Sequence, residues 1–254
     1  MRDFDTVLVS DLHLGARNCR SQEFAAFLGW VRTPRLIVNG DLFECKRASG
    51  LSTDDVAALK ALRSFAREHH VDWLRGNHDP TDDWCAGLVG LEMQPSLLLD
   101  VGSRTYLIEH GDRWDSSLHW PWMLVTAAES VYRWSQRLDR SHRLARRLKR
   151  HSKRFSGVIG AMRKGAVAEV QARGLHGVIL GHSHVAADER DEGVHYLNCG
   201  CWTERPAGFV GVRRGVARTY VWDPGSQLAR PLGASEQSAV EPSIPSTFGE
   251  LQPA

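Results

Sequence analysis

Five short, mostly apolar runs occur along the chain, and each one stops at a block of polar residues and glycine. The runs occupy residues 6–9, 36–38, 71–74, 105–108 and 177–180. Short runs rich in β-branched residues predict buried strands. The blocks that follow them are Asp11-Leu12-His13, Gly40-Asp41-Leu42-Phe43-Glu44, Gly76-Asn77-His78-Asp79, His110-Gly111-Asp112 and Gly181-His182-Ser183-His184. We therefore expect the blocks to lie at strand ends and to converge on one site.

Helical patterns separate the first three predicted strands. Residues 21–32 carry apolar side chains at i, i+3, i+4 and i+7, which predicts an amphipathic helix. Ser52 followed by Asp55 resembles a capping box and predicts a second helix that ends near residue 69. This alternation implies right-handed crossovers and a parallel sheet, and such sheets bind ligands beyond the carboxyl ends of their strands.

The remainder of the chain predicts a hairpin, a helical segment and more strands. The hairpin pairs residues 97–101 with 105–108, and strands return at 177–180, 194–198, 207–213 and 217–222. The 254 residues are enough for one α/β domain over residues 1–222, with a basic helical insertion at about 118–173. Residues 223–254 lack periodicity and are rich in Pro, Ser and Gly, so we expect a disordered tail.

Composition indicates a protein of the reducing cytosol. The apolar run at 120–128 is too short to span a bilayer, and residues 1–5 show no signal-peptide pattern. The five cysteines are scattered, which argues against a disulfide framework. Cys199 and Cys201 are closer together than zinc-site cysteines usually are, so we favour two small buried residues. We expect a cytoplasmic location, with peripheral contact to the inner face of the plasma membrane as an extension.

The polar blocks supply the ligands that a pair of divalent metal ions needs. Two neighbouring ions require several carboxylate or imidazole ligands and one shared ligand, for which Asp41 is the candidate. In an extended strand Asp11 and His13 would point to the same side, and His182 and His184 share that spacing. Asn77 offers an amide oxygen. This ligand set suits manganese, iron or zinc better than calcium, and we expect Mn²⁺. Any single block, taken alone, is better explained by a turn residue or a structural histidine, and only the five blocks in order favour a metal site.

The ordered set of five blocks resembles the calcineurin-like metallophosphoesterase superfamily over about residues 5–222. The resemblance implies a four-layer αββα sandwich with a helical lid. It implies that one metal is held by Asp11, His13, Asp41 and His184, and the other by Asp41, Asn77, His110 and His182. It places a catalytic histidine, His78, beside the metals, with Asp79 orienting it. A hydroxide held between the two metals would attack the phosphorus atom in line.

Further features resemble one branch, the UDP-2,3-diacylglucosamine pyrophosphohydrolases of lipid A synthesis. These features are Asp11-Leu12-His13-Leu14, Gly40-Asp41-Leu42-Phe43-Glu44, Arg75-Gly76-Asn77, the insertion, and residues 196–204. His78 stands where well-known members have Arg, and Cys201 where many relatives have Asp. The expected substrate is therefore the diphosphate of a UDP-sugar lipid. The alternatives are a broader phosphodiesterase or nuclease, and a metal-binding module without catalysis.

The predicted insertion is strongly basic. Residues 133–164 contain twelve Lys or Arg and one acidic residue, Asp139. An apolar stripe with basic flanks suits an anionic membrane surface, a diphosphate substrate or nucleic acid, and equally a lid with a solvated basic face. Arg17, Arg75, Arg113 and Trp114 adjoin the metal blocks and could contact substrate, but a salt bridge or a packing role fits each of them as well.

Overall fold

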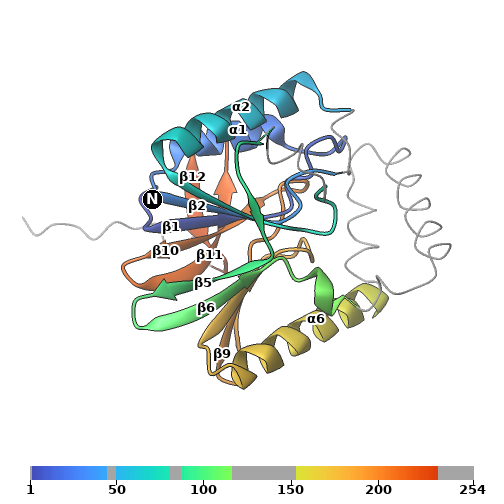
Figure 1. The fold of residues 1–254 in the computed structure, drawn as a ribbon, viewed down its shortest axis with the longest axis vertical. Coiled ribbons are helices and arrows are strands. Elements are labelled where there is room, and N and C mark those ends of the chain that lie inside the picture. The colour runs from blue at the N-terminus through green and yellow to red at the C-terminus, as the bar shows by residue number, and fades with distance from the viewer. Residues whose placement is uncertain (1, 45–49, 81–86, 88, 116–152, 234–254) are drawn as a thin grey trace, which may run out of the picture.

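The computed structural model describes residues 2–44, 50–80, 87, 89–115 and 153–233, with only the backbone of 153–156 described. Two β-sheets pack face to face, and helices cover the outer face of each (Figure 1). Helices α1 (Ser21–Trp30) and α2 (Thr53–Glu68) lie on the first sheet, and α6 (Lys153–Ala172) lies on the second. This arrangement confirms the expected four-layer αββα fold.

The first sheet has seven strands in the order β12-β11-β10-β1-β2-β3-β4. Strands β1 to β4 run parallel to one another, whereas β10 pairs antiparallel with β1, β11 with β10, and β12 with β11. Their bounds are β1 Thr6–Val9, β2 Arg35–Asn39, β3 His70–Leu74, β4 Met93–Gln94, β10 Ala207–Arg213, β11 Val216–Asp223 and β12 Leu228–Pro231.

The second sheet has five strands in the order β5-β6-β7-β9-β8. Their bounds are β5 Ser96–Val101, β6 Arg104–Glu109, β7 Gly177–Leu180, β8 Ala187–Asp191 and β9 Val194–Asn198. The β5–β6 pair is the expected hairpin, and β6, β7 and β9 run parallel. A short 3₁₀ helix, Asp112–Trp114, follows β6.

Both faces of each central strand are buried, which explains why these strands read as unbroken apolar runs. In β1, Val7 and Val9 pack toward α1 and α2, whereas Leu8 lies in the cluster between the two sheets. A third cluster joins the second sheet to α6 through Val178, Leu180 and Met162. None of the helices among the described residues is long and apolar enough to cross a membrane.

The helix signals read from the sequence are present, with shifted ends. Ser52 and Asp55 form the capping box at the start of α2. Helix α1 ends at Trp30 rather than at residue 32, because Val31 is already extended. Helix α6 forms the C-terminal part of the predicted insertion, and residues 116–152, with most of its basic residues, lie outside the described residues.

One prediction about the end of the chain is wrong within the described residues. Residues 223–254 were expected to form a disordered tail, but the main chain turns back at Asp223, and β12 pairs with β11. The carboxylate of Asp223 accepts hydrogen bonds from Gly225 N and from the Ser226 hydroxyl, which stabilises this turn. Ala229 is the one buried residue of β12, so the sequence lacks the alternation of apolar and polar residues that predicts a strand. Residues 234–254 lie outside the described residues.

Candidate metal centre

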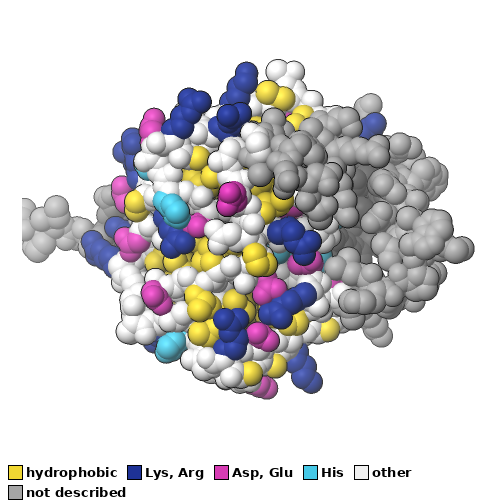
Figure 2. All heavy atoms as spheres, viewed as in Figure 1, with side chains coloured by type: hydrophobic (Ala, Val, Ile, Leu, Met, Phe, Trp, Pro, Cys, Tyr) yellow, Lys and Arg dark blue, Asp and Glu magenta, His cyan; other side chains and the backbone are white. Residues whose placement is uncertain are grey.

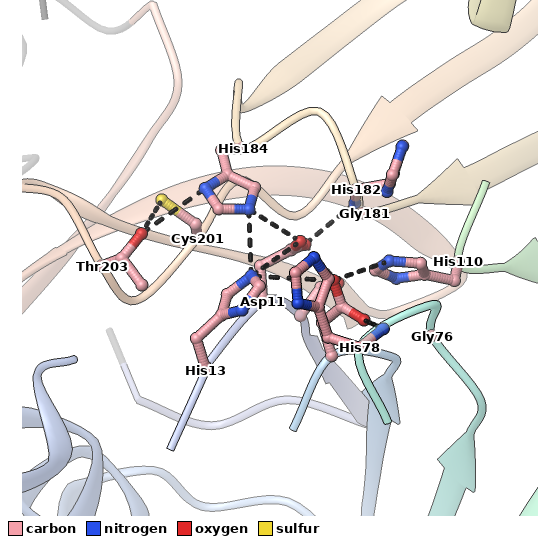
Figure 3. Close-up of polar contacts among 12 residues, drawn as sticks. Asp11, His13, Gly76, His78, His110, Gly181, His182, His184, Cys201 and Thr203 are labelled. Atoms are coloured by element: carbon pink, nitrogen blue, oxygen red, sulfur yellow. Dashed lines mark hydrogen bonds and ion pairs between the residues drawn. The ribbon is translucent and has the colours of Figure 1, made fainter. Parts of the chain in front are cut away.

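The five polar blocks follow the carboxyl ends of β1, β2 and β3 in the first sheet and of β6 and β7 in the second. Within each sheet these strands run parallel, so their carboxyl ends share one edge. Because the two sheets pack face to face, blocks from both sheets meet in one cluster of side chains (Figure 3). The sequence-predicted residues Asp11, His13, Asp41, His110 and His184 are all brought together there.

The blocks are sharp turns rather than strand extensions. Asp11, His13, Asp41, His182 and His184 all have positive φ angles, between 52° and 60°. Asp and His tolerate this left-handed region better than most residues, and clusters of such conformations mark functional sites. The expected extended geometry of Asp11 and His13 is therefore wrong. They reach one point because the chain curls after Val9, where β1 ends.

One cluster joins Asp11, His13 and His184. Nε2 of His184 lies 3.2 Å from Asp11 Oδ1 and 3.1 Å from Nε2 of His13, and His13 Nε2 lies 3.7 Å from Asp11 Oδ1. The second carboxylate oxygen of Asp11 accepts hydrogen bonds from Ser10 Oγ and His182 N, at 2.6 and 2.9 Å. One oxygen and two imidazole nitrogens are therefore left facing a common point.

A second cluster joins Asp41, His110 and His182. Oδ2 of Asp41 lies 3.2 Å from His110 Nε2 and 3.6 Å from His13 Nε2, so this one carboxylate faces both clusters. The other oxygen, Oδ1, accepts a hydrogen bond from His78 N at 2.8 Å. Asp41 therefore has the position that a shared ligand needs.

The polar atoms of the site fit bound cations. Asp11 Oδ1, Asn77 Oδ1 and His110 Nε2 are buried and make no well-aligned hydrogen bond among the described residues. The close polar neighbours of Asp11 Oδ1 and His110 Nε2 are themselves candidate ligands, His184 and Asp41. Such atoms are costly to bury unless a ligand or an ion satisfies them. Nitrogen and oxygen donors of this kind suit divalent transition metals.

The charge balance of the site also calls for cations. Burial alone would lower the pKa of His110, but the carboxylate of Asp41 raises it to about 10. Burial likewise opposes protonation of His13, yet hydrogen bonds with Asp11 and Glu44 raise its pKa to about 10. The carboxylates thus draw positive charge to the imidazoles, and a bound divalent ion would displace these protons.

Each imidazole is oriented by a hydrogen bond on its far nitrogen. His110 Nδ1 donates to Asn39 O at 2.9 Å, and His13 Nδ1 lies 2.7 Å from Glu44 Oε2. His182 Nε2 lies 2.9 Å from Asp115 Oδ2. Such partners fix the tautomer and direct the opposite nitrogen at the metal. Cys201 and Thr203 flank His184 on its outer side (Figure 3).

Sequence reasoning assigned no role to Glu44 or Asp115. Glu44 closes the second polar block, and Asp115 comes three residues after Asp112, the last residue of the His110 block. A carboxylate within a few residues of a ligand block was the available signal. Such carboxylates are common in sequences, and only the folded structure shows that these two contact His13 and His182.

The predicted role of Asp79 is wrong. Asp79 was expected to orient His78, but its carboxylate accepts hydrogen bonds from the backbone N–H groups of Asp41, Gly76 and Phe43. Asp79 therefore ties the third block to the second. The His78 ring is held by the Glu44 carbonyl, 3.0 Å from Nδ1, and its centroid lies 5.0 Å from that of His13.

The four proposed substrate contacts fall into two groups. Arg113 binds Glu109, with Nε and Oε1 2.6 Å apart, and its guanidinium lies 4.1 Å from the centre of the Trp114 ring. Trp114 packs against Gly165 of α6. Arg113 and Trp114 thus have structural partners, whereas Arg17 and Arg75 are exposed, four residues after His13 and next to Gly76 in the sequence.

Comparison with known proteins agrees with the fold and the blocks. The phosphoesterase Yfce from E. coli is 15% identical, with a TM-score of 0.50, over 88% of this chain and 95% of its own. A single mutant of Vps29 from Entamoeba histolytica is 14% identical, with a TM-score of 0.49, over 89% and 97%. A search of curated proteins finds no match. The family described as calcineurin-like phosphoesterase matches residues 4–186, which include all five blocks. The chain therefore belongs to the calcineurin-like phosphoesterase family and is a phosphoester hydrolase.

Proposed function

We propose that the chain holds two divalent metal ions and uses them to hydrolyse a phosphoester. One ion would be held by Asp11, His13, Asp41 and His184, and the other by Asp41, Asn77, His110 and His182. The observation that carries this proposal is the position of Asp41 Oδ2, which faces His13 and His110 at 3.6 and 3.2 Å. Mn²⁺ is the proposed metal, since imidazole and carboxylate ligands suit it.

The side chains around the ions would position the reactants. Bound divalent ions acidify water and neutralise phosphoryl charge. Glu44 and Asp115 would keep the imidazoles of His13 and His182 in the metal-binding tautomer. His78 lies beside His13, and its Nδ1 is engaged by the Glu44 carbonyl. Its Nε2 is then the atom that would donate a hydrogen bond or a proton to the phosphoryl or leaving oxygen.

We further propose the diphosphate of a UDP-sugar lipid, such as UDP-2,3-diacylglucosamine, as the substrate. The support is the detailed form of the ligand blocks together with the segment Tyr196–Glu204. Residues 196–203 of this segment are buried, and Cys201 and Thr203 adjoin His184, so this end of the segment can shape the site. The exposed arginines Arg17 and Arg75 are candidates for contact with the phosphate groups.

A membrane contact would bring such a substrate to the site. Figure 2 shows Lys and Arg interspersed with Asp and Glu over the described part of one face, which is not an obviously basic surface. The support for a contact therefore comes from the composition of residues 133–164. Basic residues near an anionic bilayer contribute about 1 kcal/mol each.

A hydrolysis panel on Mn²⁺-loaded protein tests the proposal. It compares UDP-2,3-diacylglucosamine, a simple phosphodiester, a phosphomonoester and single-stranded DNA. Highest kcat/KM on the UDP-lipid supports the substrate assignment. Preference for the phosphodiester or for DNA replaces it with the corresponding alternative, and no hydrolysis of any member contradicts the proposed chemistry.

Vesicle sedimentation tests the membrane contact separately. We expect binding to anionic vesicles at low salt, weaker binding to neutral vesicles, and release by high salt. The variant with Arg146, Arg147, Lys149 and Arg150 changed to Gln should bind less and lose more activity on the diacylated substrate than on a soluble diester. Equal losses on both substrates would identify the insertion as a lid with a solvated basic face.

A further inference from the structure

A cavity lies at the end of the two sheets opposite the metal centre. Its volume is about 340 Å³, and its walls include Arg104, Arg190, Arg218, Tyr106, His195 and Leu232. Arg104 begins β6, whereas His110 follows the end of the same strand. Six residues of extended chain span about 20 Å, so the cavity is separate from the metal centre.

A chain of hydrogen bonds forms the base of this cavity. The Tyr106 hydroxyl lies 2.9 Å from His195 Nδ1, and His195 Nε2 lies 2.9 Å from Asp188 Oδ1. The other oxygen of Asp188 accepts a hydrogen bond from Thr219 N at 3.0 Å. Tyr106 and His195 are buried, at 2% and 8% exposure. The base is therefore rigid and polar, and it links β6, β8 and β9 of one sheet to β11 of the other.

The proton positions along this chain follow from the partners. Burial alone would raise the pKa of Asp188, but hydrogen bonds from His195 and from Thr219 N lower it. Because an ionised carboxylate can only accept, His195 donates to Asp188 from Nε2, and the Tyr106 hydroxyl lies 2.9 Å from Nδ1 of the same ring. Burial raises the pKa of Tyr106, and the neighbouring Arg104 opposes this rise. The negative charge of Asp188 is thus engaged at the base.

Three guanidinium groups surround the cavity. Arg104 shares one face of β6 with Tyr106, and Arg190 shares one face of β8 with Asp188, because residues two apart in a strand point the same way. Arg218 comes from β11. All three are exposed, and no carboxylate among the described residues lies within ion-pair distance of any of them. With Asp188 engaged at the base, the cavity presents an excess of positive charge.

We propose that this cavity binds a phosphate-class anion, either inorganic phosphate or the phosphate of a phosphomonoester. Guanidinium groups recognise phosphate through paired, charge-assisted hydrogen bonds, and three of them around one small cavity match its charge and size. Because its walls come from both sheets, the bound anion would join them at the end remote from the metal centre. Leu232 and the exposed Val216 would contact any organic group attached to the phosphate. This site does not depend on the proposed substrate.

Amide NMR of the full-length, Zn²⁺-loaded protein tests the proposal, because Zn²⁺ does not broaden the resonances. Inorganic phosphate and uridine monophosphate are titrated separately, with KCl at matched ionic strength as the baseline. We expect saturable shifts of the Ala217 and His195 amides, distinct from any shifts at Asn77 beside the metals. The anion that binds more tightly identifies free phosphate or a phosphomonoester as the ligand.

Two double variants complete the test. Arg190→Gln/Arg218→Gln should raise the Kd at the Ala217 and His195 amides by about tenfold or more, since it removes two charge-assisted contacts. Arg63→Gln/Arg67→Gln removes two exposed charges from α2 and should leave this Kd unchanged. Because Arg190 and Arg218 are exposed, their replacement should leave the fold intact. Unchanged amide resonances outside the cavity would show that it does. No saturable shift with either anion, or the same Kd in both variants, overturns the proposal.

Discussion

Gly76 is the residue whose replacement most directly tests how tightly the ligand blocks are packed. A Cβ atom at this position would overlap the carboxylate and the backbone nitrogen of Asp41 and would lie 2.9 Å from Asp41 Cγ. The Asp41 main chain cannot move freely, because Asp41 N donates to Asp79 and Asp41 O accepts from His13 N. The Gly76→Ala change therefore has to displace the residue that faces both clusters.

The magnitude follows from two opposing effects. Overpacking costs about 1–3 kcal/mol, whereas Gly→Ala stabilises by about 0.4–1 kcal/mol through the unfolded chain. We expect a net destabilisation of about 1–2 kcal/mol for Gly76→Ala, or a Tm lower by about 2–8 °C for a domain of this size. Movement of Asp41 should also weaken metal binding by about 10–100-fold, which is the usual effect of removing a residue that hydrogen-bonds to a metal ligand.

Thermal unfolding with and without Mn²⁺ measures both effects. At 100 times its Kd, Mn²⁺ should stabilise the wild type by about 2.7 kcal/mol, but a variant that binds tenfold more weakly by about 1.4 kcal/mol. Gly160→Ala is the matched control, since Gly160 is exposed in α6 with open space around its Cβ position. It should raise stability by about 0.5–1 kcal/mol and leave metal binding unchanged. Wild-type Tm and metal affinity in Gly76→Ala would refute the packing argument.

Three further predictions concern single groups of the site. His78→Ala should keep its metal but lose about 10²–10⁴-fold in kcat, and loss of metal instead would make His78 structural. Asp115→Asn should weaken metal binding by about 10–100-fold while the fold stays intact. Unchanged metal affinity would show that Asp115 does not orient the His182 ring for metal binding. Metal affinity should rise with pH, because below about pH 10 the ion must displace protons from His13 and His110. A Kd measured between pH 6 and 8.5 checks this sign, and tighter binding at the lower pH would contradict it.

The parts of the fold that were predictable are those coded by local pattern. The central strands are buried on both faces, so they appear in the sequence as short apolar runs. The capping-box pair Ser52 and Asp55 likewise predicted the start of α2. Strand β8 was missed because residues 187–191 are mostly charged and lie at a sheet edge. Its pairing with β9 is set by tertiary contacts, including Thr219 Oγ1 donating to Ala187 O at 2.6 Å.

The composition of the site was predictable, but its geometry was not. Strand-end position placed Asp11 and Asp41 together because parallel strands of one sheet share an edge. His110 follows a strand of the other sheet, and it joins them because the two sheets pack face to face. The left-handed turns at these blocks depend on contacts across the sheet. The Asp79 carboxylate, for instance, holds the Asp41 backbone from 38 residues away. For the same reason the roles of Glu44 and Asp115 emerged only from the packed structure.

Metal content is the most direct test of the central claim, that two ions share Asp41. Elemental analysis of purified, Mn²⁺-loaded protein should give two equivalents for the wild type, about one for Asp11→Ala and almost none for Asp41→Ala. The two variants each remove one buried carboxylate, so a general loss of stability would affect both alike. Near-full metal content in Asp41→Ala, or one equivalent in the wild type, would contradict the shared site.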